Sequence, residues 1–232
     1  MEFENSPEKK ELFQIVNINP EPIGLFTLPN EKHLDFKKII NSIFNNSPDS
    51  LRQQFDAEPY THHICNRSEQ NIFKSFPELS ELKSYFERYL TTYIKTIGHN
   101  CNEVLINSAW LNKANKDAIL NYHLHTNSFV SANYFVDYDP NIHSPLSFRN
   151  DRVSVNSIPT FPILDVSLNK DITIYTADKL DITAKEGQII VWRSHNPHGY
   201  LNPNKGDNRI TLSLNCFPKV LDNGRYRVTI SQ

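Results

Sequence analysis

The chain has 232 residues, of which 38% are hydrophobic and 22% charged, so it carries enough apolar side chains for one sizeable core. Its formal net charge is −2, and no cluster of Lys and Arg marks a surface for nucleic acid or acidic lipid. The first residues lack the basic start and apolar stretch of a signal peptide, and no apolar run approaches the ~18 residues that span a bilayer. We therefore expect a single soluble, intracellular domain over 1–232, with no membrane partner and no directly bound nucleic acid.

The first hundred residues contain an arm followed by helices. Residues 1–29 hold several prolines among short apolar runs, which is typical of an extended strand-and-turn arm. Residues 30–45 and 77–97 each repeat apolar side chains at about 3.6-residue spacing, which predicts two helices. The expected apolar stripe of the first helix contains Leu34, Ile39, Ile40 and Ile43, with Phe36 and Phe44 near it. We expect 1–102 to form an arm and helices that lie on a sheet.

From residue 103 onward the pattern changes to short β-rich runs between turn residues. The predicted strands are 104–112, 119–125, 129–137, 171–176, 188–193, 208–217 and 225–230. Such a series is typical of a double-sheet or barrel core, so the fold class is α+β. The proline-rich stretch 139–162 shows little periodicity and is expected to be a loop over a site.

The three cysteines are expected to be reduced residues of the core. Cys65, Cys101 and Cys216 are odd in number and form no CxxC pair. This spacing argues against a disulfide framework and against a cysteine zinc site.

Two histidines separated by one residue are the first candidate metal ligands. In a strand over 121–128, Asn121, His123 and His125 would share one face, because side chains alternate. The Cα atoms of the two histidines would lie about 6.5 to 7 Å apart. Both rings could then reach one ion at about 2.0 to 2.1 Å. On this pattern alone, two histidines that bind no metal are an equally good interpretation.

A second segment contains His198 and precedes an alternating strand. Residues 187–200 (GQIIVWRSHNPHGY) form an apolar run that enters a turn at His198, and 209–215 (RITLSLN) follow shortly after. Apolar residues at 210, 212 and 214 alternate with polar residues at 209, 211, 213 and 215, so one strand face is apolar and the other polar. A polar face open to solvent and a polar barrel interior both explain this pattern.

The order of these motifs resembles that of the 2-oxoglutarate and Fe(II)-dependent oxygenases, which carry HxD/E, a distal His and then Arg-x-Ser/Thr. More narrowly, three stretches resemble an oxygenase family of bacteria and bacteriophages: 123–135 (HLHTNSFVSANYF), 187–198 (GQIIVWRSHNPH) and 209–215 (RITLSLN). The resemblance covers about 104–217. It implies a double-stranded β-helix, a jelly-roll or cupin-like barrel, over 103–232, and a cytoplasmic protein encoded by a bacterium or by a virus of one.

The resemblance also implies roles for single residues. His123 and His198 would be Fe(II) ligands, Arg209 would pair with the C5 carboxylate of 2-oxoglutarate, and Thr211 would add a hydroxyl donor. A guanidinium suits that task because its planar fork binds a carboxylate through two hydrogen bonds, which Lys cannot do. With O2 as second substrate, the implied activity is that of a dioxygenase that hydroxylates its substrate and releases succinate and CO2.

Ser131 and Tyr134, on the strand after the histidine pair, would line the cosubstrate pocket. The motifs do not choose between a small molecule, a peptide and a protein as the substrate, because a fold does not decide function.

His125 stands where the superfamily usually has a carboxylate. A neutral imidazole leaves one more positive charge on the metal, and a three-histidine site also suits zinc, copper or nickel. Alternatively His125 does not ligate, and two histidines and waters hold the ion. His195 is another candidate third ligand, but His198 lies in the Pro-His turn that matches the family.

Other chemically active side chains receive structural interpretations. His62, His63 and Cys65 form a cluster, but neighbouring residues of a strand face opposite ways, so we expect structural or surface roles with a small chance of substrate contact. Trp110 and Trp192 lie in β-rich runs and are expected in the core.

Two other function classes fit the same residues. A cupin-like metal-dependent enzyme would use the three histidines without 2-oxoglutarate, and its metal binding would be indifferent to Arg209. A jelly-roll binding module, such as a carbohydrate-binding or virion component, would hold no catalytic metal at His123.

Overall fold

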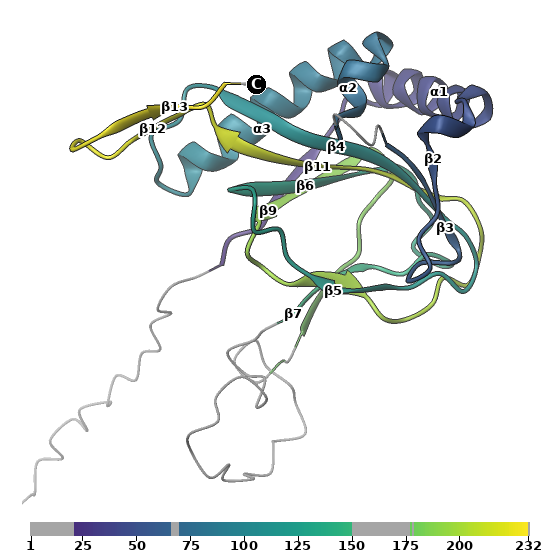
Figure 1. Cartoon of the computed structure of the whole chain (residues 1–232). Helices are drawn as coiled ribbons and strands as arrows, with labels where there is room; N and C mark the ends of the chain where they lie inside the picture. Colours follow the sequence, from purple (N-terminus) through teal and green to yellow (C-terminus); the bar gives the residue numbers. More distant parts are fainter. Residues whose placement is uncertain (1–20, 66–69, 150–176, 178, 232) are drawn as a thin grey trace, which may run out of the picture.

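Helices lie on one side of a large sheet, and a smaller sheet lies on its other side (Figure 1). The computed structural model describes residues 21–65, 70–149, 177 and 179–231. The predicted α+β class is confirmed, but the strands form separate antiparallel sheets rather than one closed barrel. No helix of the described part of the chain is long and apolar enough to cross a membrane.

Both predicted helices are present. α1 spans Asn30–Asn46, and the second predicted helix appears as the 3₁₀ turn η2, Pro77–Leu79, followed by α3, Ser80–Thr96. A further 3₁₀ turn, η1, spans Asp49–Leu51, and the short helix α2 spans Ile72–Ser75.

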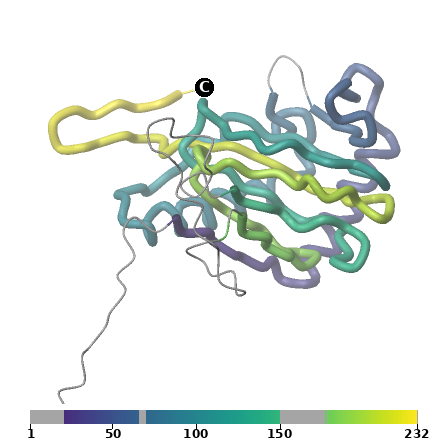
Figure 2. The backbone as a smooth tube through the Cα atoms, turned by 90° about the horizontal axis from the view of Figure 1, so that it is seen from below, coloured from purple at the N-terminus to yellow at the C-terminus, as the bar shows by residue number. Residues whose placement is uncertain are grey.

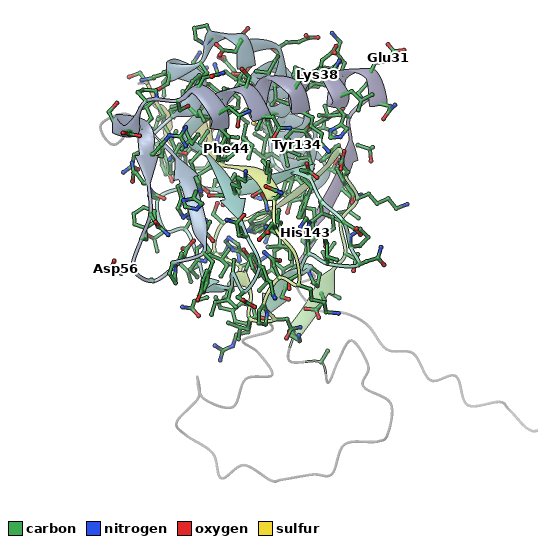
Figure 3. The ribbon with its side chains drawn as sticks, turned by 90° about the vertical axis from the view of Figure 1, so that its right-hand side faces the viewer. Glu31, Lys38, Phe44, Asp56, Tyr134 and His143 are labelled. Carbon is green, nitrogen blue, oxygen red and sulfur yellow. The ribbon has the colours of Figure 1, made fainter. Side chains whose placement is uncertain are left out.

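The apolar stripe of α1 differs from the predicted one. The side chains that it buries belong to His33, Phe36, Ile40, Ile43 and Phe44, whereas Leu34 is 45% exposed. The two phenylalanines and both of these isoleucines were expected in or near the stripe. The structure differs by leaving Leu34 out and including His33, a polar residue that apolar spacing does not mark. Figure 3 shows Phe44 directed toward the sheet and Glu31 and Lys38 on the outer side of the helix.

The major sheet has seven strands in the order β1-β9-β6-β11-β4-β3-β2. Along the sheet, the strands are β1 (Gly24–Thr27), β9 (Gln188–Arg193), β6 (Val130–Asp137), β11 (Arg209–Pro218), β4 (Val104–Ala114), β3 (Thr61–Ile64) and β2 (Arg52–Gln53). Figure 2 shows the long central strands side by side. Three strands, β1, β2 and β3, precede residue 103, so the sheet draws on both halves of the chain.

The minor sheet has four strands in the order β5-β10-β7-β8. They are β5 (Leu120–His123), β10 (His198–Tyr200), β7 (Leu146–Arg149) and β8 (Lys179–Ile182). A separate hairpin, β12 (Val220–Asp222) with β13 (Arg227–Thr229), projects from the body in Figures 1 and 2.

The predicted strands at 104–112, 119–125, 129–137, 188–193, 208–217 and 225–230 correspond to β4, β5, β6, β9, β11 and β13. The predicted strand 171–176, the stretch 150–162 and residues 1–20 lie outside the described residues. The stretch 139–162 was expected to be a loop over a site, but Leu146–Arg149 within it forms strand β7, in register with β8 and β10.

The alternating strand 209–215 places its two faces as the sequence pattern requires. Ile210, Leu212 and Leu214 are buried in the main hydrophobic cluster, which also contains apolar side chains of α1 and α3. The polar residues of the same strand face the minor sheet and line a cavity there. The polar face of this strand therefore lines the space between the two sheets and is not open to bulk solvent.

Candidate metal and cosubstrate site

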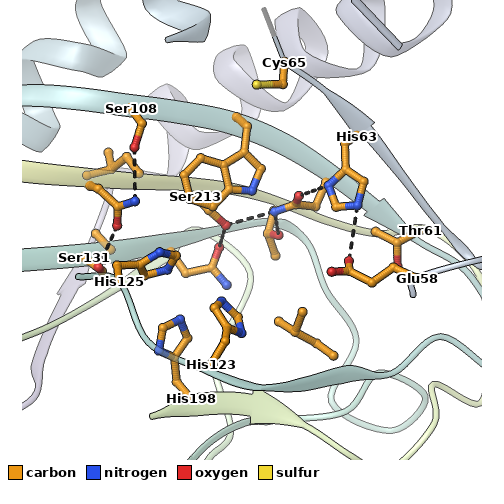
Figure 4. A pocket seen from close by; sticks show the side chains of 18 of the residues that line it. Glu58, Thr61, His63, Cys65, Ser108, His123, His125, Ser131, His198 and Ser213 are labelled. Carbon is orange, nitrogen blue, oxygen red and sulfur yellow. Dashed lines mark hydrogen bonds and ion pairs between the residues drawn. The ribbon is translucent and has the colours of Figure 1, made fainter. Parts of the chain in front are cut away.

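A cavity of about 480 Å³ lies between the two sheets. This volume falls within the ~300 to 1,000 Å³ of small-molecule sites. Its wall combines polar side chains of the major sheet with histidines of the minor sheet (Figure 4). The candidate residues among its lining are His63, Trp110, His123, His125, Ser131, Trp192, His198, Arg209 and Thr211.

Three of the predicted ligands come together at one end of this cavity. β5 and β10 are antiparallel and place His123 directly opposite His198. The ring centroids lie 4.4 Å apart for His123 and His198, 5.1 Å for His123 and His125, and 5.2 Å for His125 and His198. One nitrogen of each ring lies within 4.8 Å of the others, close to the spacing that a shared ion requires.

Gly199 permits the close approach of the two ligand strands. A Cβ at this position would lie 2.5 Å from the backbone oxygen of Leu120 and 2.9 Å from that of Asn121. No side chain can tolerate such contacts with backbone atoms. The glycine after His198 is therefore required for the pairing that sets His198 opposite His123.

Backbone carbonyls fix the tautomer of two of the imidazoles. Nδ1 of His123 lies 2.9 Å from the oxygen of Asn121, and Nδ1 of His198 lies 2.9 Å from that of Asn196. A carbonyl oxygen can only accept, so each Nδ1 carries the proton and donates. The lone pair is then on Nε2 of both rings, and Nε2 is available to bind a metal.

Burial keeps two of the rings neutral. It lowers the pKa of His198 to about 3, helped by the neighbouring His123 and opposed by the hydrogen bond to Asn196. Burial, and then His123, lowers the pKa of His125 to about 4. Both rings are uncharged at neutral pH, which is the form that metals bind.

His125 joins the cluster although it lies just beyond the end of β5. Its backbone nitrogen donates to the oxygen of Ser194 at 2.9 Å, which ties this segment to the turn after β9. The alternative ligand His195 lies elsewhere: its side chain is 62% exposed, and its Nε2 is 3.6 Å from Glu21. The geometry therefore brings together His123, His125 and His198 and leaves His195 out.

A buried polar network lies beneath the histidines. Ser131 is 1% exposed, and its Oγ lies 2.7 Å from Oδ1 of Asn215 and 2.9 Å from Oγ of Ser194. Ser128 also donates to Ser194 at 2.8 Å. Since Ser194 holds the backbone of His125, this network is suited to positioning that ligand. Ser131 lines the cavity, as expected, but its hydroxyl already has protein partners.

Arg209 lies at a different part of the same cavity and is 3% exposed. Its guanidinium carbon is 4.5 Å from the ring centre of Tyr200, 5.3 Å from that of Phe135 and 5.8 Å from that of Tyr138. Nε donates to the oxygen of Ser144 at 3.4 Å, while the buried Nη2 has no hydrogen-bond partner among the described residues. No described carboxylate forms an ion pair with it.

A buried cation without an anion is costly, because its charge has left water and nothing compensates it. The side chain of Arg209 could therefore pair with an anionic group that enters the cavity. Its aromatic surroundings add cation–π attraction but supply no hydrogen-bond acceptor for Nη2.

A chain of hydrogen bonds crosses the wall between these parts. Nδ2 of Asn112 donates to Oγ of Ser213 at 2.9 Å and lies 3.3 Å from Oγ1 of Thr211. Ser213 in turn donates to Oδ1 of Asn133 at 3.1 Å. Thr211 lines the cavity two residues from Arg209, as predicted. Asn112 and Asn133 were not predicted as cavity residues. Each lies two positions from a cavity residue on the same strand, Trp110 and Ser131, so strand alternation could have predicted them.

The expectation that Tyr134 lines the cosubstrate pocket is wrong. Tyr134 lies three residues from Ser131 on β6, so its side chain leaves the opposite face of the sheet. It is fully buried against the helices, where its hydroxyl lies 2.7 Å from Nδ1 of His33 and its ring packs on Phe86. Figure 3 shows it beneath α1. The tyrosine therefore belongs to the core and not to the cosubstrate pocket.

Two further expectations change. Trp192 is buried, as predicted, but its ring also lies 4.7 Å from that of His198. Trp110 is only half-buried and lines the cavity, with its ring 6.0 Å from that of His125. Each tryptophan thus contacts the ligand cluster.

The cluster at 62–65 is divided by strand alternation. His62 is exposed, whereas His63 is buried and lines the cavity. Of the three cysteines, Cys101 and Cys216 are buried, as expected, while Cys65 is half-buried at the cavity wall. His63 and Cys65 therefore lie where contact with a substrate is possible.

Comparisons with known proteins agree with this geometry. The family model described as "Putative 2OG-Fe(II) oxygenase" matches residues 108–215. A comparison with curated protein sequences finds no match.

Solved structures share the fold at low sequence identity. The crystal structure of HygX from Streptomyces hygroscopicus with nickel, 2-oxoglutarate and hygromycin B bound has a TM-score of 0.56 at 12% identity, covering 85% of this chain and 83% of that one. A Pseudomonas putida prolyl-4-hydroxylase gives 0.54 at 10% identity, covering 84% and 92%. The non-heme alpha ketoglutarate dependent epimerase SnoN from nogalamycin biosynthesis gives 0.59 at 8% identity, covering 91% and 87%.

These likenesses confirm the double-stranded β-helix fold that the sequence motifs implied. The matched segment contains the three histidines, Arg209 and Thr211. Residues 108–215 of this chain are therefore similar, in sequence and in fold, to the 2OG-Fe(II) oxygenases.

Proposed function

We propose that the chain is an Fe(II)- and 2-oxoglutarate-dependent dioxygenase that hydroxylates a substrate and releases succinate and CO2. The observation that carries this proposal is the buried guanidinium of Arg209. It lacks an anionic partner among the described residues and faces the cavity into which three imidazoles also point. A single dicarboxylate could bind a metal at the histidines through one end and pair with Arg209 through the other.

The donor set of the proposed metal site fits a divalent first-row ion. Imidazole nitrogens are suitable ligands for iron, and also for zinc, copper and nickel. His123 and His198 would ligate through Nε2, since each Nδ1 donates to a carbonyl. We assign His125 as the third ligand because its ring completes the cluster. Without a carboxylate ligand, the site would keep the full charge of the ion, which favours an anionic cosubstrate.

The proposed cosubstrate site uses Arg209 and Thr211. A guanidinium can donate two parallel hydrogen bonds to the C5 carboxylate of 2-oxoglutarate, and Nη2 is free to do so. The hydroxyl of Thr211, two residues along the same strand face, can donate a further bond. Tyr200, Phe135 and Tyr138 would exclude water from this charge pair and so strengthen it.

When bound, Fe(II) would supply the redox chemistry by which O2 and 2-oxoglutarate give succinate and CO2 while a substrate C–H bond becomes C–OH. The protein's own contribution is to position and to exclude water. Ser194 and its partners hold His125, the backbone oxygens of Asn121 and Asn196 orient the other two rings, and Trp192 covers His198.

The test is binding of 2-oxoglutarate to purified protein loaded with Fe(II) without oxygen. We expect a one-to-one complex in the wild type. Arg209→Ala should weaken 2-oxoglutarate binding by about a hundredfold, since two charge-assisted hydrogen bonds are lost, and should leave metal content unchanged. Arg209→Lys should restore only part of the affinity, because an ammonium cannot bind both carboxylate oxygens in plane.

Arg227→Ala, at the exposed hairpin, is the matched control for removing an arginine. Failure of the Fe(II)-loaded wild type to bind 2-oxoglutarate would contradict the proposal. Stoichiometric metal with no cosubstrate binding, unaffected by Arg209, would favour a cupin-like metal enzyme instead. Incorporation of ¹⁸O from O2 into a product would distinguish hydroxylation from other outcomes of this chemistry, since one structural neighbour is an epimerase.

A further inference from the structure

The cavity continues beyond the three histidines and Arg209 to a wall formed by the β2–β3 region. Phe55, Glu58 and His63 line this part, and Figure 4 shows the last two facing each other. Trp110 also lines the cavity, with its ring 6.0 Å from that of His125. A ten-atom cosubstrate stretched from Arg209 to the histidines would leave this wall uncovered. We take it to be where the substrate of the proposed oxygenase binds.

The charges of the wall are unequal. Among the described residues that line the cavity, Arg209 is the one Lys or Arg, and Glu58 is the one Asp or Glu. If 2-oxoglutarate pairs with Arg209, as the proposed function requires, the side chain of Glu58 is the remaining charged group of that lining. A substrate with a negative group at this wall would meet a carboxylate and no described cation.

The hydrogen bonds of His63 sharpen this argument. Nδ2 of Asn112 donates to Ser213, which fixes the orientation of the amide, so Oδ1 of Asn112 faces Nδ1 of His63 at 2.8 Å and accepts from it. In the neutral form of the ring, with the proton on Nδ1, Nε2 has a lone pair. That nitrogen is buried, has no hydrogen-bond partner among the described residues, and lies 3.2 Å from Oε2 of Glu58, with which a protonated ring would form an ion pair.

Two acceptors thus face each other across a short gap. The side chain of His63 is 8% exposed and that of Glu58 is 24% exposed, so water is partly excluded from both. A lone pair beside a carboxylate is unfavourable unless a donor lies between them. A primary ammonium carries three donors and a positive charge, so it can bond to both acceptors at once.

Aromatic side chains flank this pair of acceptors. The ring of Phe55 is 4.9 Å from that of His63 and the residue is 49% exposed, at the rim. Trp110 extends the apolar surface toward the ligand cluster. An aromatic face attracts a cation and also packs against an apolar stem.

We infer that Glu58 and His63 form the recognition site for a primary ammonium group of the substrate, whose apolar or aromatic part lies along Trp110 toward the metal. The inference rests on the proposed function for the direction in which the substrate lies. The ammonium could belong to a free small-molecule amine or to the side chain of a lysine in a peptide, since both present the same chemistry.

The test uses three probes of one shape at pH 8: 2-phenylethylamine, 2-phenylethanol and 3-phenylpropionate. Each is titrated calorimetrically into the metal-loaded protein in the presence of 2-oxoglutarate, after binding of 2-oxoglutarate itself has been measured. We expect the amine to bind at least about tenfold more tightly than the other two, as for a charge-assisted hydrogen bond in a partly buried site. Glu58→Gln should abolish this preference and leave 2-oxoglutarate affinity unchanged.

Glu78→Gln, an exposed carboxylate at the 3₁₀ turn η2, is the matched control and should keep the preference. A second arm compares a blocked Ala-Lys-Ala peptide with its norleucine counterpart: tighter binding than the free amine identifies a peptide as the source, and weaker binding a small molecule. Three results would each overturn the inference. The carboxylate or the alcohol binds as well as the amine, or the amine preference survives in Glu58→Gln. The third result is no amine binding at 10 mM, which is on the order of the weakest useful affinity. Loss of 2-oxoglutarate binding in the wild type would instead overturn the proposed function.

Discussion

The two faces of the major sheet are made by the same strands and have opposite tasks. On β11, Ile210, Leu212 and Leu214 pack with the helices, while Arg209 and Thr211 line the cavity. The helix face is apolar and closed. The cavity face is polar, and the guanidinium that it buries has an unsatisfied donor. Stability is therefore expected to come from one face and ligand binding from the other, and substitutions can test this division.

The largest effect is expected on the helix face. Leu212 is fully buried, and Leu212→Ala should lower the free energy of unfolding by about 2 to 5 kcal/mol, because it removes buried methyl groups and leaves a cavity. Urea denaturation measures the change. A loss below 1 kcal/mol, roughly that of a surface substitution, would show that this face is not the source of stability.

The next effect is expected at the ligand cluster. His198→Ala should reduce metal affinity by at least about a hundredfold, since even partners of metal ligands contribute ten- to hundredfold. The unfolding free energy without metal should change much less than in Leu212→Ala. Elemental analysis after dialysis measures the first quantity and urea denaturation the second. His195→Ala is the matched control, because that side chain is exposed and outside the cluster. Equal metal loss in both variants would contradict the assignment.

Gly199→Ala tests how the two ligand strands are held together. The added Cβ would meet the backbone oxygen of Leu120 at 2.5 Å, so β10 must shift away from β5. We expect a loss of about 1 to 3 kcal/mol in stability, as for overpacking, together with weaker metal binding. Gly224→Ala, in the projecting hairpin, adds a Cβ that meets no atom within 4 Å but lies at a φ of +81°, so it measures the cost of backbone strain without a steric clash. Unchanged metal affinity in Gly199→Ala would show that the strand pairing does not set the site.

The smallest effect is expected from Thr211→Val, which keeps the shape of the side chain and removes its hydroxyl. One hydrogen bond to the cosubstrate should be lost, about 1 kcal/mol, or severalfold in 2-oxoglutarate affinity. Calorimetry measures this change beside the larger one of Arg209→Ala. An affinity equal to that of the wild type would remove Thr211 from the proposed cosubstrate site and leave Arg209 in it.

Features that depend on local alternation could be predicted from the sequence. The period of two in 209–215 placed Arg209 and Thr211 on one face and Leu212 on the other, and the same rule put His123 and His125 together. Tyr134 shows the rule misapplied, since a residue three positions from Ser131 has the opposite parity. The family resemblance supplied the link between His198 and Arg209 that local pattern could not.

Features that depend on pairing between distant segments could not be predicted. β3 pairs with β4 across nearly fifty residues, and only this pairing brings His63 beside Asn112 in the cavity wall. Strand β7 lies in a stretch without clear periodicity, and its place is set by β8 and β10. The aromatic residues around Arg209 come from two distant segments, β6 with the residue that follows it and β10. Sequence separation hides such contacts because no local pattern records the partner.

The central claim is that one molecule of 2-oxoglutarate joins the metal at the histidines to Arg209. The most direct test is the affinity of 2-oxoglutarate for the wild type and for Arg209→Ala, each measured by calorimetry with and without bound metal. Bridging predicts that metal raises the affinity of the wild type by at least about tenfold, and that removing Arg209 weakens binding in the metal-loaded protein. An affinity that is the same with and without metal, or that does not depend on Arg209, would contradict the account.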